Sequence, residues 1–288
     1  MLIKGGKICT MTGQGTIVGD ILVKEGKIVA VSEQISAPED DYTLDAYGLV
    51  IMPGMIDAYI HDCPEVDEAL LRSSQAAGVT IGLIWPENQG ACNMITSESV
   101  EETRIFALQP ENYTDAQLHD RFISMAEAGK RIGCRINNAR ECQRVLQVIH
   151  STRVKAILAH LSGCEDMLEA VALSGCPVII GISDRLHSSP WTIVNRLDAL
   201  GVPVAVTCSY PNAKLRFLPL CAALSLRDGM DRERALHTVT TAPAAILGRS
   251  DAGRVAEGCR ADFAIYDGDP LLLATSHVMT IAGGKIRC

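Results

Sequence analysis

The stretch Gly48-Leu49-Val50-Ile51-Met52-Pro53-Gly54-Met55-Ile56-Asp57-Ala58 sets the fold of this 288-residue chain. It is a nearly continuous apolar run, broken once by Pro53-Gly54 and followed by Tyr59-Ile60-His61. Such a run predicts a strand that is buried on both faces, as in a parallel sheet. We therefore expect a buried strand here, with the polar side chains that follow it lying at its carboxyl end.

Further along the chain, similar apolar runs alternate with helical stretches. The runs include residues 78–84, 134–137, 155–159, 177–180 and 202–206, and the helical stretches include 65–77, 114–130, 142–150, 164–173 and 191–200. In the second helical stretch, Thr114 is a suitable N-cap and Gln117 completes a capping box. Repeated β-then-α units predict a parallel sheet, and no GxGxxG follows the first strand, which disfavours a nucleotide-binding open sheet.

The number of strands indicates a (β/α)8-type (TIM-like) barrel of the α/β class over residues 51–250. We count seven clear strands and expect a weak eighth near 91–95 or 104–108, so an incomplete barrel is the alternative. The two chain ends, residues 1–50 and 251–288, differ from the middle because they consist of short apolar runs separated by glycine turns. We predict that they pair with each other as one small β domain.

Composition excludes several classes of protein. The chain is 48% hydrophobic with a net charge of −8 and has no Lys/Arg run, so nucleic acid is a poor partner and disorder is not expected. No apolar stretch reaches the ~18 residues of a membrane span, and the start MLIKGGKICT has no signal-peptide core. The eleven cysteines are scattered and form no CxxC pair, which favours reduced thiols in a cytoplasmic protein.

Several stretches together resemble the amidohydrolase superfamily. Residues 48–58 are similar to the segment that enters its first barrel strand. Residues 241–248 (TAPAAILG) are similar to its asparagine-proline-alanine element, and residues 258–264 (GCRADFA) to its glycine-lysine-x-alanine-aspartate turn. Residues 177–181 and 216–223 are similar to the imidazolonepropionase-like branch. The resemblance implies a barrel flanked by a small β-sandwich from both termini.

The resemblance also implies a divalent metal, typically zinc, held at the barrel mouth by histidines and an aspartate, where it activates water for hydrolysis of a carbon–nitrogen bond. The first strand of the family ends in His-x-His, but here it reads Tyr59-Ile60-His61. A phenol binds a metal well only as phenolate, and its pKa is near 10. The sixth-strand histidine is kept as His160. We therefore take His61 and His160 as the candidate catalytic residues and Tyr59 as a substrate-binding residue.

The other two implied ligands are also replaced. The fifth-strand histidine corresponds to Asn137, with Asn138 as the alternative, and the eighth-strand aspartate corresponds to Ser209. An amide oxygen is a weak zinc ligand, and a serine hydroxyl does not take up a proton at neutral pH. We expect Asn137 and Ser209 to contact substrate, together with Arg216, which could meet an anionic group. The segment between strands one and five is also shorter than the resemblance implies.

A remodelled metal site is the alternative to a lost one. Its candidate ligands all fall at or just after expected strand ends, and they are His61, Asp62, Cys63, His160, Asp184 and Cys208. Cys208 could instead be a nucleophile with His160 as base, but no orienting third group is visible in the sequence. We interpret His187 as a solvated loop residue.

Two functional hypotheses follow. One is a barrel that keeps the fold of hydrolases of small, possibly cyclic amides but binds a small molecule or a partner without metal-dependent hydrolysis. The other is an active hydrolase with a remodelled mononuclear site on His61 and His160. Three missing ligands favour the first hypothesis and predict no bound zinc. By analogy with other barrels that carry an added β domain, we expect a homo-oligomer.

Overall fold

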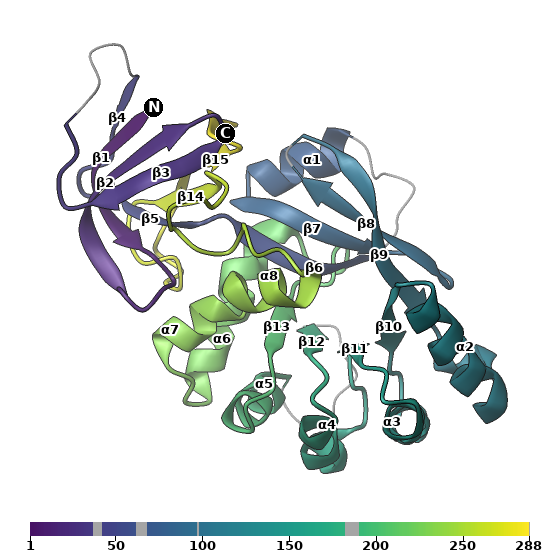
Figure 1. The fold of residues 1–288 in the computed structure, drawn as a ribbon. Coiled ribbons are helices and arrows are strands. Elements are labelled where there is room, and N and C mark those ends of the chain that lie inside the picture. Colours follow the sequence, from purple (N-terminus) through teal and green to yellow (C-terminus); the bar gives the residue numbers. More distant parts are fainter. Residues whose placement is uncertain (37–41, 62–67, 97, 182–189, 288) are drawn as a thin grey trace.

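The computed structural model describes residues 1–36, 42–61, 68–96, 98–181 and 190–287, with the backbone alone for 68, 69, 71 and 72. Its strands form two eight-stranded sheets, which lie side by side in Figure 1. One sheet is built from both ends of the chain and the other from the middle. No helix in the described part of the chain is long and apolar enough to cross a membrane.

The terminal sheet joins the two ends of the chain. Its strands are β1 (Leu2–Cys9), β2 (Thr16–Lys24), β3 (Lys27–Ser32), β4 (Thr43–Asp45), β5 (Val50–Pro53), β14 (Phe263–Tyr266), β15 (His277–Ala282) and β16 (Lys285–Ile286). The order is β16-β15-β14-β5-β1-β2-β3, with β4 also paired to β1. The antiparallel β5–β14 ladder connects the N-terminal to the C-terminal strands, and the sheet has an apolar core of its own. That it folds as a separate β-sandwich domain stays a prediction.

The second sheet is the barrel. Its strands follow each other in chain order and are β6 (Met55–His61), β7 (Val79–Trp85), β8 (Gly90–Thr96), β9 (Val100–Leu108), β10 (Arg131–Arg135), β11 (Ala156–Ala159), β12 (Val178–Gly181) and β13 (Val204–Thr207). The strands from β9 to β13 are parallel, as are β6 and β7. The first and last strands lie next to each other, and the His61 N–H donates to the Tyr210 carbonyl at 2.8 Å. The barrel is therefore nearly closed.

The strand expected over residues 50–58 is in fact two strands in different sheets, so that part of the prediction is wrong. The chain changes sheets at Pro53-Gly54. Proline has no N–H to donate to a ladder, which makes it suitable for a strand end. A Cβ on Gly54 would lie 2.3 Å from Thr80 Oγ1, so only glycine fits the crossing point.

The weak eighth strand was expected at either 91–95 or 104–108, and the structure has a strand at both places. They form β8 and β9, and β8 is antiparallel to both of its neighbours. The links that flank β8 contain only a few residues, whereas a parallel crossover needs about a dozen or more. A hairpin meander therefore replaces two β-then-α units, and the barrel keeps eight strands with one reversed.

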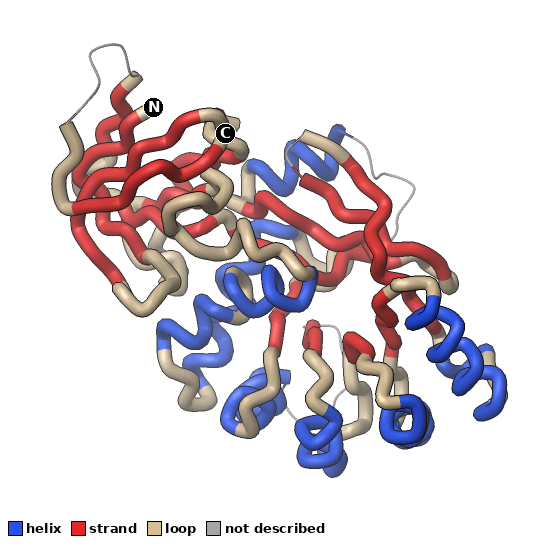
Figure 2. Tube along the Cα trace, viewed as in Figure 1, coloured by secondary structure: helices blue, strands red, loops and turns tan. Residues whose placement is uncertain are grey.

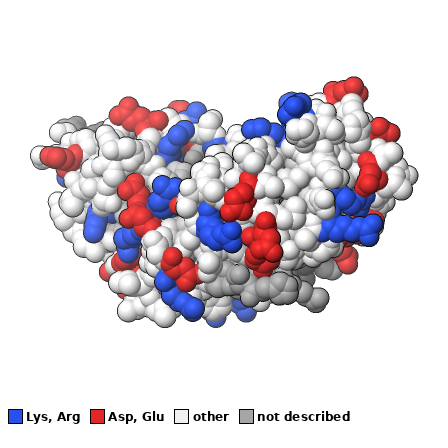
Figure 3. All heavy atoms as spheres, turned by 90° about the horizontal axis from the view of Figure 1, so that it is seen from below, with Lys and Arg blue, Asp and Glu red and all other residues white. Residues whose placement is uncertain are grey.

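Most of the helices lie on the outer side of the barrel strands (Figure 2), whereas the last one packs Ile246 against the side chains of the barrel interior. They are α1 (Glu68–Gln75), α2 (Asp115–Glu127), α3 (Ala139–Thr152), α4 (Leu168–Ser174), α5 (Pro190–Ala199), α6 (Leu218–Arg227), α7 (Arg232–His237) and α8 (Thr241–Leu247). The capping box predicted at the start of α2 is confirmed, because Thr114 and Gln117 exchange side-chain to backbone hydrogen bonds. On the face shown in Figure 3, acidic and basic side chains are interspersed.

Candidate functional site

Strand β6 carries the first group of candidate residues to the barrel mouth. Tyr59 and His61 are two residues apart on this strand and their rings are in contact, and the ladder with β7 is irregular between Asp57 and Ile60. Asp57 and Tyr59 are fully buried, and His61 is half-buried at the carboxyl end of the strand. Active sites of β/α barrels lie at this end.

Three residues singled out from the sequence meet at this mouth. The Tyr59 ring packs edge-on against His160, with the ring centroids 4.4 Å apart, and edge-on against His61 at 4.9 Å. The two imidazoles are stacked with centroids 6.3 Å apart. The Tyr59 ring thus contacts both His61 and His160. Tyr59 is at a position where the family resemblance implies a metal ligand.

Trp85, which sequence reasoning missed, supports this cluster from the end of β7. Its ring centroid lies 5.0 Å from that of Tyr59, and its indole N–H donates to the Ala58 carbonyl at 2.9 Å. Gly133 on β10 makes room for it, because a Cβ there would lie 2.5 Å from the indole ring. The buried interior of the barrel is therefore filled with aromatic side chains at this level.

Arg135, at the end of β10, is a second residue that sequence reasoning missed. Its guanidinium carbon lies 5.7 Å from the centre of the Tyr59 ring. The side chain is held by hydrogen bonds to the carbonyls of Pro86 and Glu87, in the turn between β7 and β8. The meander thus fixes a cation beside the aromatic cluster. In the sequence, the signal for Arg135 was its place as a polar residue at the end of an apolar strand.

Two buried polar atoms at the mouth stand out. His61 Nε2 and Ser209 Oγ have no hydrogen-bond partner among the described residues. A buried polar group without a partner costs roughly 1–3 kcal/mol, and native proteins tolerate few of them. These two atoms are therefore the groups best placed to hydrogen-bond a ligand or an ordered water.

The backbone at the mouth is held in an uncommon conformation. His160, Leu161 and Ser209 have φ values of 80°, 53° and 53°, in the left-handed region that favours glycine. Such residues cost about 1–3 kcal/mol each and cluster at binding and catalytic sites. Both loops that carry candidate residues, after β11 and after β13, show this feature.

The environment of His61 keeps its imidazole neutral at pH 7. Burial, followed by the neighbouring His160 and Arg135, lowers the pKa of His61 to about 4. The unfolded chain takes up this proton near pH 6.5, so the folded state loses stability as the pH falls from about 6.5 to about 4. Because the ring is only partly buried, solvent screening leaves an expected loss of about 1–2 kcal/mol.

We therefore expect the free energy of unfolding of the wild type to fall more steeply between pH 7 and pH 4.5 than that of His61→Gln. Urea denaturation at both pH values measures the difference. His119→Gln, at a partly exposed position on α2 away from this cluster, is the matched control and should keep the wild-type slope. Equal slopes for the wild type and His61→Gln would contradict the lowered pKa of His61.

Cys208 lies against the buried carboxyl group of Asp57. Its Sγ lies 3.0 Å from Asp57 Oδ2 and donates to that carboxylate. Burial and the negative charge of Asp57 raise the pKa of the Cys208 thiol far above its usual range. Metal binding and nucleophilic attack both require the thiolate. The raised pKa disfavours Cys208 as a nucleophile, whereas its role as a metal ligand stays a prediction.

The structure does not bring Asn137 and Arg216 into the aromatic cluster. Asn137 is exposed, and its Nδ2 lies 3.5 Å from Glu111 Oε1. Asn138 is the N-cap of α3, with its side chain bonded to the Glu141 N–H. Arg216 stacks on Phe217 and lines a separate cavity of about 340 Å³ beside α1 and the terminal sheet.

The described residues of this site do not by themselves make up a zinc site. They supply two histidine nitrogens, and no group of three or more His, Cys, Asp or Glu side chains lies close enough to hold a metal in the part of the chain that the structure describes. The planes of the two imidazoles differ by only 19° in a stacked arrangement, so their lone pairs do not converge without a ring rotation. Asp62, Cys63, Asp184 and His187 lie outside the described residues.

Comparison with known proteins agrees with this architecture. The model of the amidohydrolase family matches residues 193–287. The chain is 39% identical over 61 residues to an allantoinase of Enterococcus faecalis, a match that covers 21% of the chain and 12% of that enzyme. It is 36% identical over 91 residues to an imidazolonepropionase of Streptomyces griseus, covering 31% of the chain and 22% of the relative. The chain thus matches less than a quarter of the length of either curated relative.

The solved structure of an amidohydrolase from Thermotoga maritima superimposes with a TM-score of 0.85 at 19% sequence identity, covering 99% of this chain and 98% of the other. At that identity the likeness establishes the fold alone. The sequence matches indicate relatedness, which the shared fold alone does not. Residues 48–58 and 258–264 resemble the same superfamily in sequence. The family match over residues 193–287, the partial sequence matches and the shared fold together support placing the chain in the amidohydrolase superfamily.

Proposed function

We propose that this protein binds a small cyclic amide at the barrel mouth and does not carry out the metal-dependent hydrolysis typical of its superfamily. The observation that carries the proposal is the packing of Tyr59, which is fully buried with its ring against both His61 and His160. A phenol stands where the resemblance implies the first histidine ligand. With Asn137 and Ser209 at two more ligand positions, the implied metal site is degenerate.

The unpartnered groups at the mouth match the chemistry of an amide. An amide ring offers a carbonyl acceptor and an N–H donor. A neutral imidazole carries one donor and one acceptor nitrogen, and a serine hydroxyl can donate and accept. His61 Nε2 and Ser209 Oγ are buried, so they gain more from such a ligand than exposed groups would. That relatives are named allantoinase and imidazolonepropionase supports the choice of ligand class.

Isothermal titration calorimetry with hydantoin, a five-membered cyclic amide, tests the proposal. We expect saturable binding to the wild-type chain and roughly tenfold weaker binding to Ser209→Ala and to His160→Ala, because each loses about one hydrogen bond or ring contact to the ligand. His150→Ala, at an exposed position on α3, is the matched control and should bind like the wild type. Absence of binding, or equal affinity in all variants, would contradict this assignment.

We also propose a cytoplasmic location. The nine cysteines that the structure describes are free thiols, and eight of them are buried. Secreted proteins with this many cysteines typically pair them, whereas buried free thiols are ordinary in a reducing compartment.

A further inference from the structure

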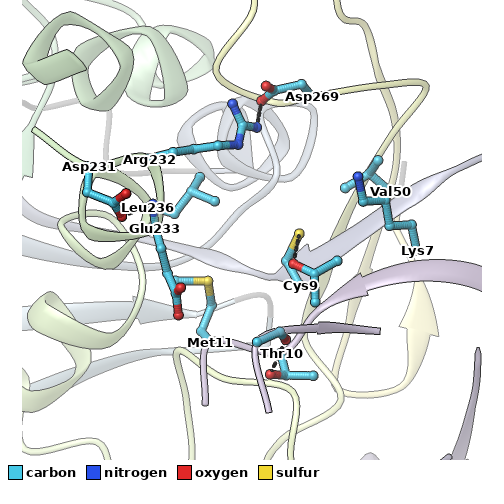
Figure 4. Close-up of a pocket in the computed structure, with 12 residues that line it drawn as sticks. Lys7, Cys9, Thr10, Met11, Val50, Asp231, Arg232, Glu233, Leu236 and Asp269 are labelled. Carbon is cyan, nitrogen blue, oxygen red and sulfur yellow. Dashed lines mark hydrogen bonds and ion pairs between the residues drawn. The ribbon is translucent and has the colours of Figure 1, made fainter. Parts of the chain in front are cut away.

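A second cavity lies away from the barrel mouth, between the terminal sheet and α7. Its volume is about 440 Å³, within the range of small-molecule sites. Strands β1 and β5 form one wall, and α7 with its preceding residue forms the other (Figure 4). None of the residues of the aromatic cluster lines it, so it is independent of the proposed amide site.

The two walls carry opposite charges. Asp231 and Glu233 lie on the α7 side and Lys7 on the β1 side, as Figure 4 shows. Lys7 takes part in no ion pair with the described residues. An ion pair joins Arg232 of α7 to Asp269 in the loop after β14, which satisfies that pair of charges. Lys7 lies on one side and two carboxylates lie on the other, where Asp231 Oδ1 also caps α7 and Glu233 Oε1 lies 3.8 Å from His237 Nε2.

The deeper part of the cavity is apolar. Met11, Val50 and Leu236 are buried there, beside the half-buried Cys9 thiol, whose sulfur accepts a hydrogen bond from Thr16. Burial raises the pKa of Cys9, so its side chain adds polarizable surface without charge. A ligand complementary to this lining has two opposite charges at its polar end and a short apolar chain.

We propose that this cavity is a binding site for a small zwitterion of the amino-acid type. The carboxylate of the ligand faces Lys7, its ammonium group faces Asp231 and Glu233, and its aliphatic side chain packs on Leu236 and Val50. Charge-assisted hydrogen bonds of this kind are about twice as strong as neutral ones, and the two opposed walls select for both charges at once.

Calorimetric titration of the full chain with L-norvaline tests the site, with n-butylamine and valerate as analogues that each lack one charge. We expect norvaline to bind roughly tenfold more tightly than either analogue, because each loses one charge-assisted contact. Lys7→Met and Glu233→Gln should each weaken norvaline binding by roughly the same factor.

Two controls separate this site from the rest of the molecule. Lys24→Met and Glu257→Gln remove the same charges at exposed positions outside the cavity and should leave norvaline affinity unchanged. Hydantoin binding should be the same in Lys7→Met as in the wild type, so failure of one proposal does not imply failure of the other. The inference is overturned if norvaline does not bind, if butylamine binds equally well, or if neither cavity variant changes the affinity.

Discussion

Replacing Asp57 by alanine is expected to lower the free energy of unfolding by about 3–5 kcal/mol, the cost of removing a buried carboxyl group that holds several hydrogen bonds. The Asp57 carboxylate is fully buried and joins the first and last barrel strands. Its Oδ1 lies 2.5 Å from Thr207 Oγ1 and 3.0 Å from the Tyr59 N, and its Oδ2 lies 3.0 Å from Cys208 Sγ. Removing the carboxyl group takes this acceptor from the Tyr59 N–H and the Cys208 Sγ, and it leaves Thr207 Oγ1 with the Tyr59 carbonyl at 2.7 Å.

Urea denaturation measures this effect, and two further variants locate its origin. Thr207→Val removes one donor and should cost about 1–2 kcal/mol. Asp120→Ala, an exposed carboxylate on α2, should change the free energy of unfolding by less than about 0.5 kcal/mol. If Asp57→Ala were as stable as Asp120→Ala, the barrel would not be closed through this carboxylate.

Trp85→Ala is the second change with a large expected effect, a loss of about 3–5 kcal/mol in the free energy of unfolding. Trp85 has no exposed surface, contacts the Tyr59 ring and fills the space above Gly133. Its truncation leaves a cavity in the barrel interior and frees the Ala58 carbonyl. Because Tyr59 loses one neighbour, we also expect hydantoin binding to weaken.

The reverse change tests the same packing from the other side. Gly133→Ala introduces a Cβ that would lie 2.5 Å from the Trp85 ring, and overpacking of this kind costs about 1–3 kcal/mol. Leu173→Ala, with 90% of its side chain exposed, is the control and should be nearly neutral. Chemical denaturation compares all three variants. A stable Trp85→Ala protein would show that the interior is not packed around the indole.

Local signals in the sequence predicted much of the fold correctly. The capping box of Thr114 and Gln117 is a local signal that spans only four residues, and α2 begins directly after Thr114, as this signal predicts. The reversed strand β8 was not predictable in the same way, because an apolar run does not encode its direction. The division between β5 and β6 depended on the contact of Gly54 with Thr80, 26 residues further along the chain, which no local pattern reveals.

The candidate site was predictable to the extent that it follows strand periodicity. Tyr59 and His61 share a face because they are two residues apart, and His160 meets them because parallel strands end at one mouth. The partner of Cys208 was not predictable, since Asp57 is 151 residues away and the two meet only when the barrel closes. Arg135 was missed because its role depends on the turn between β7 and β8, a feature of the unexpected meander.

The central claim, a superfamily barrel without the usual metal site, is tested most directly by the metal content of the protein. The chain would be purified without a polyhistidine tag after growth with added zinc and examined by elemental analysis. The account predicts far less than one zinc per chain, and unchanged stability after treatment with a chelator. About one zinc per chain, lost in His61→Gln or His160→Ala, would contradict it and establish a remodelled metal site on those two histidines.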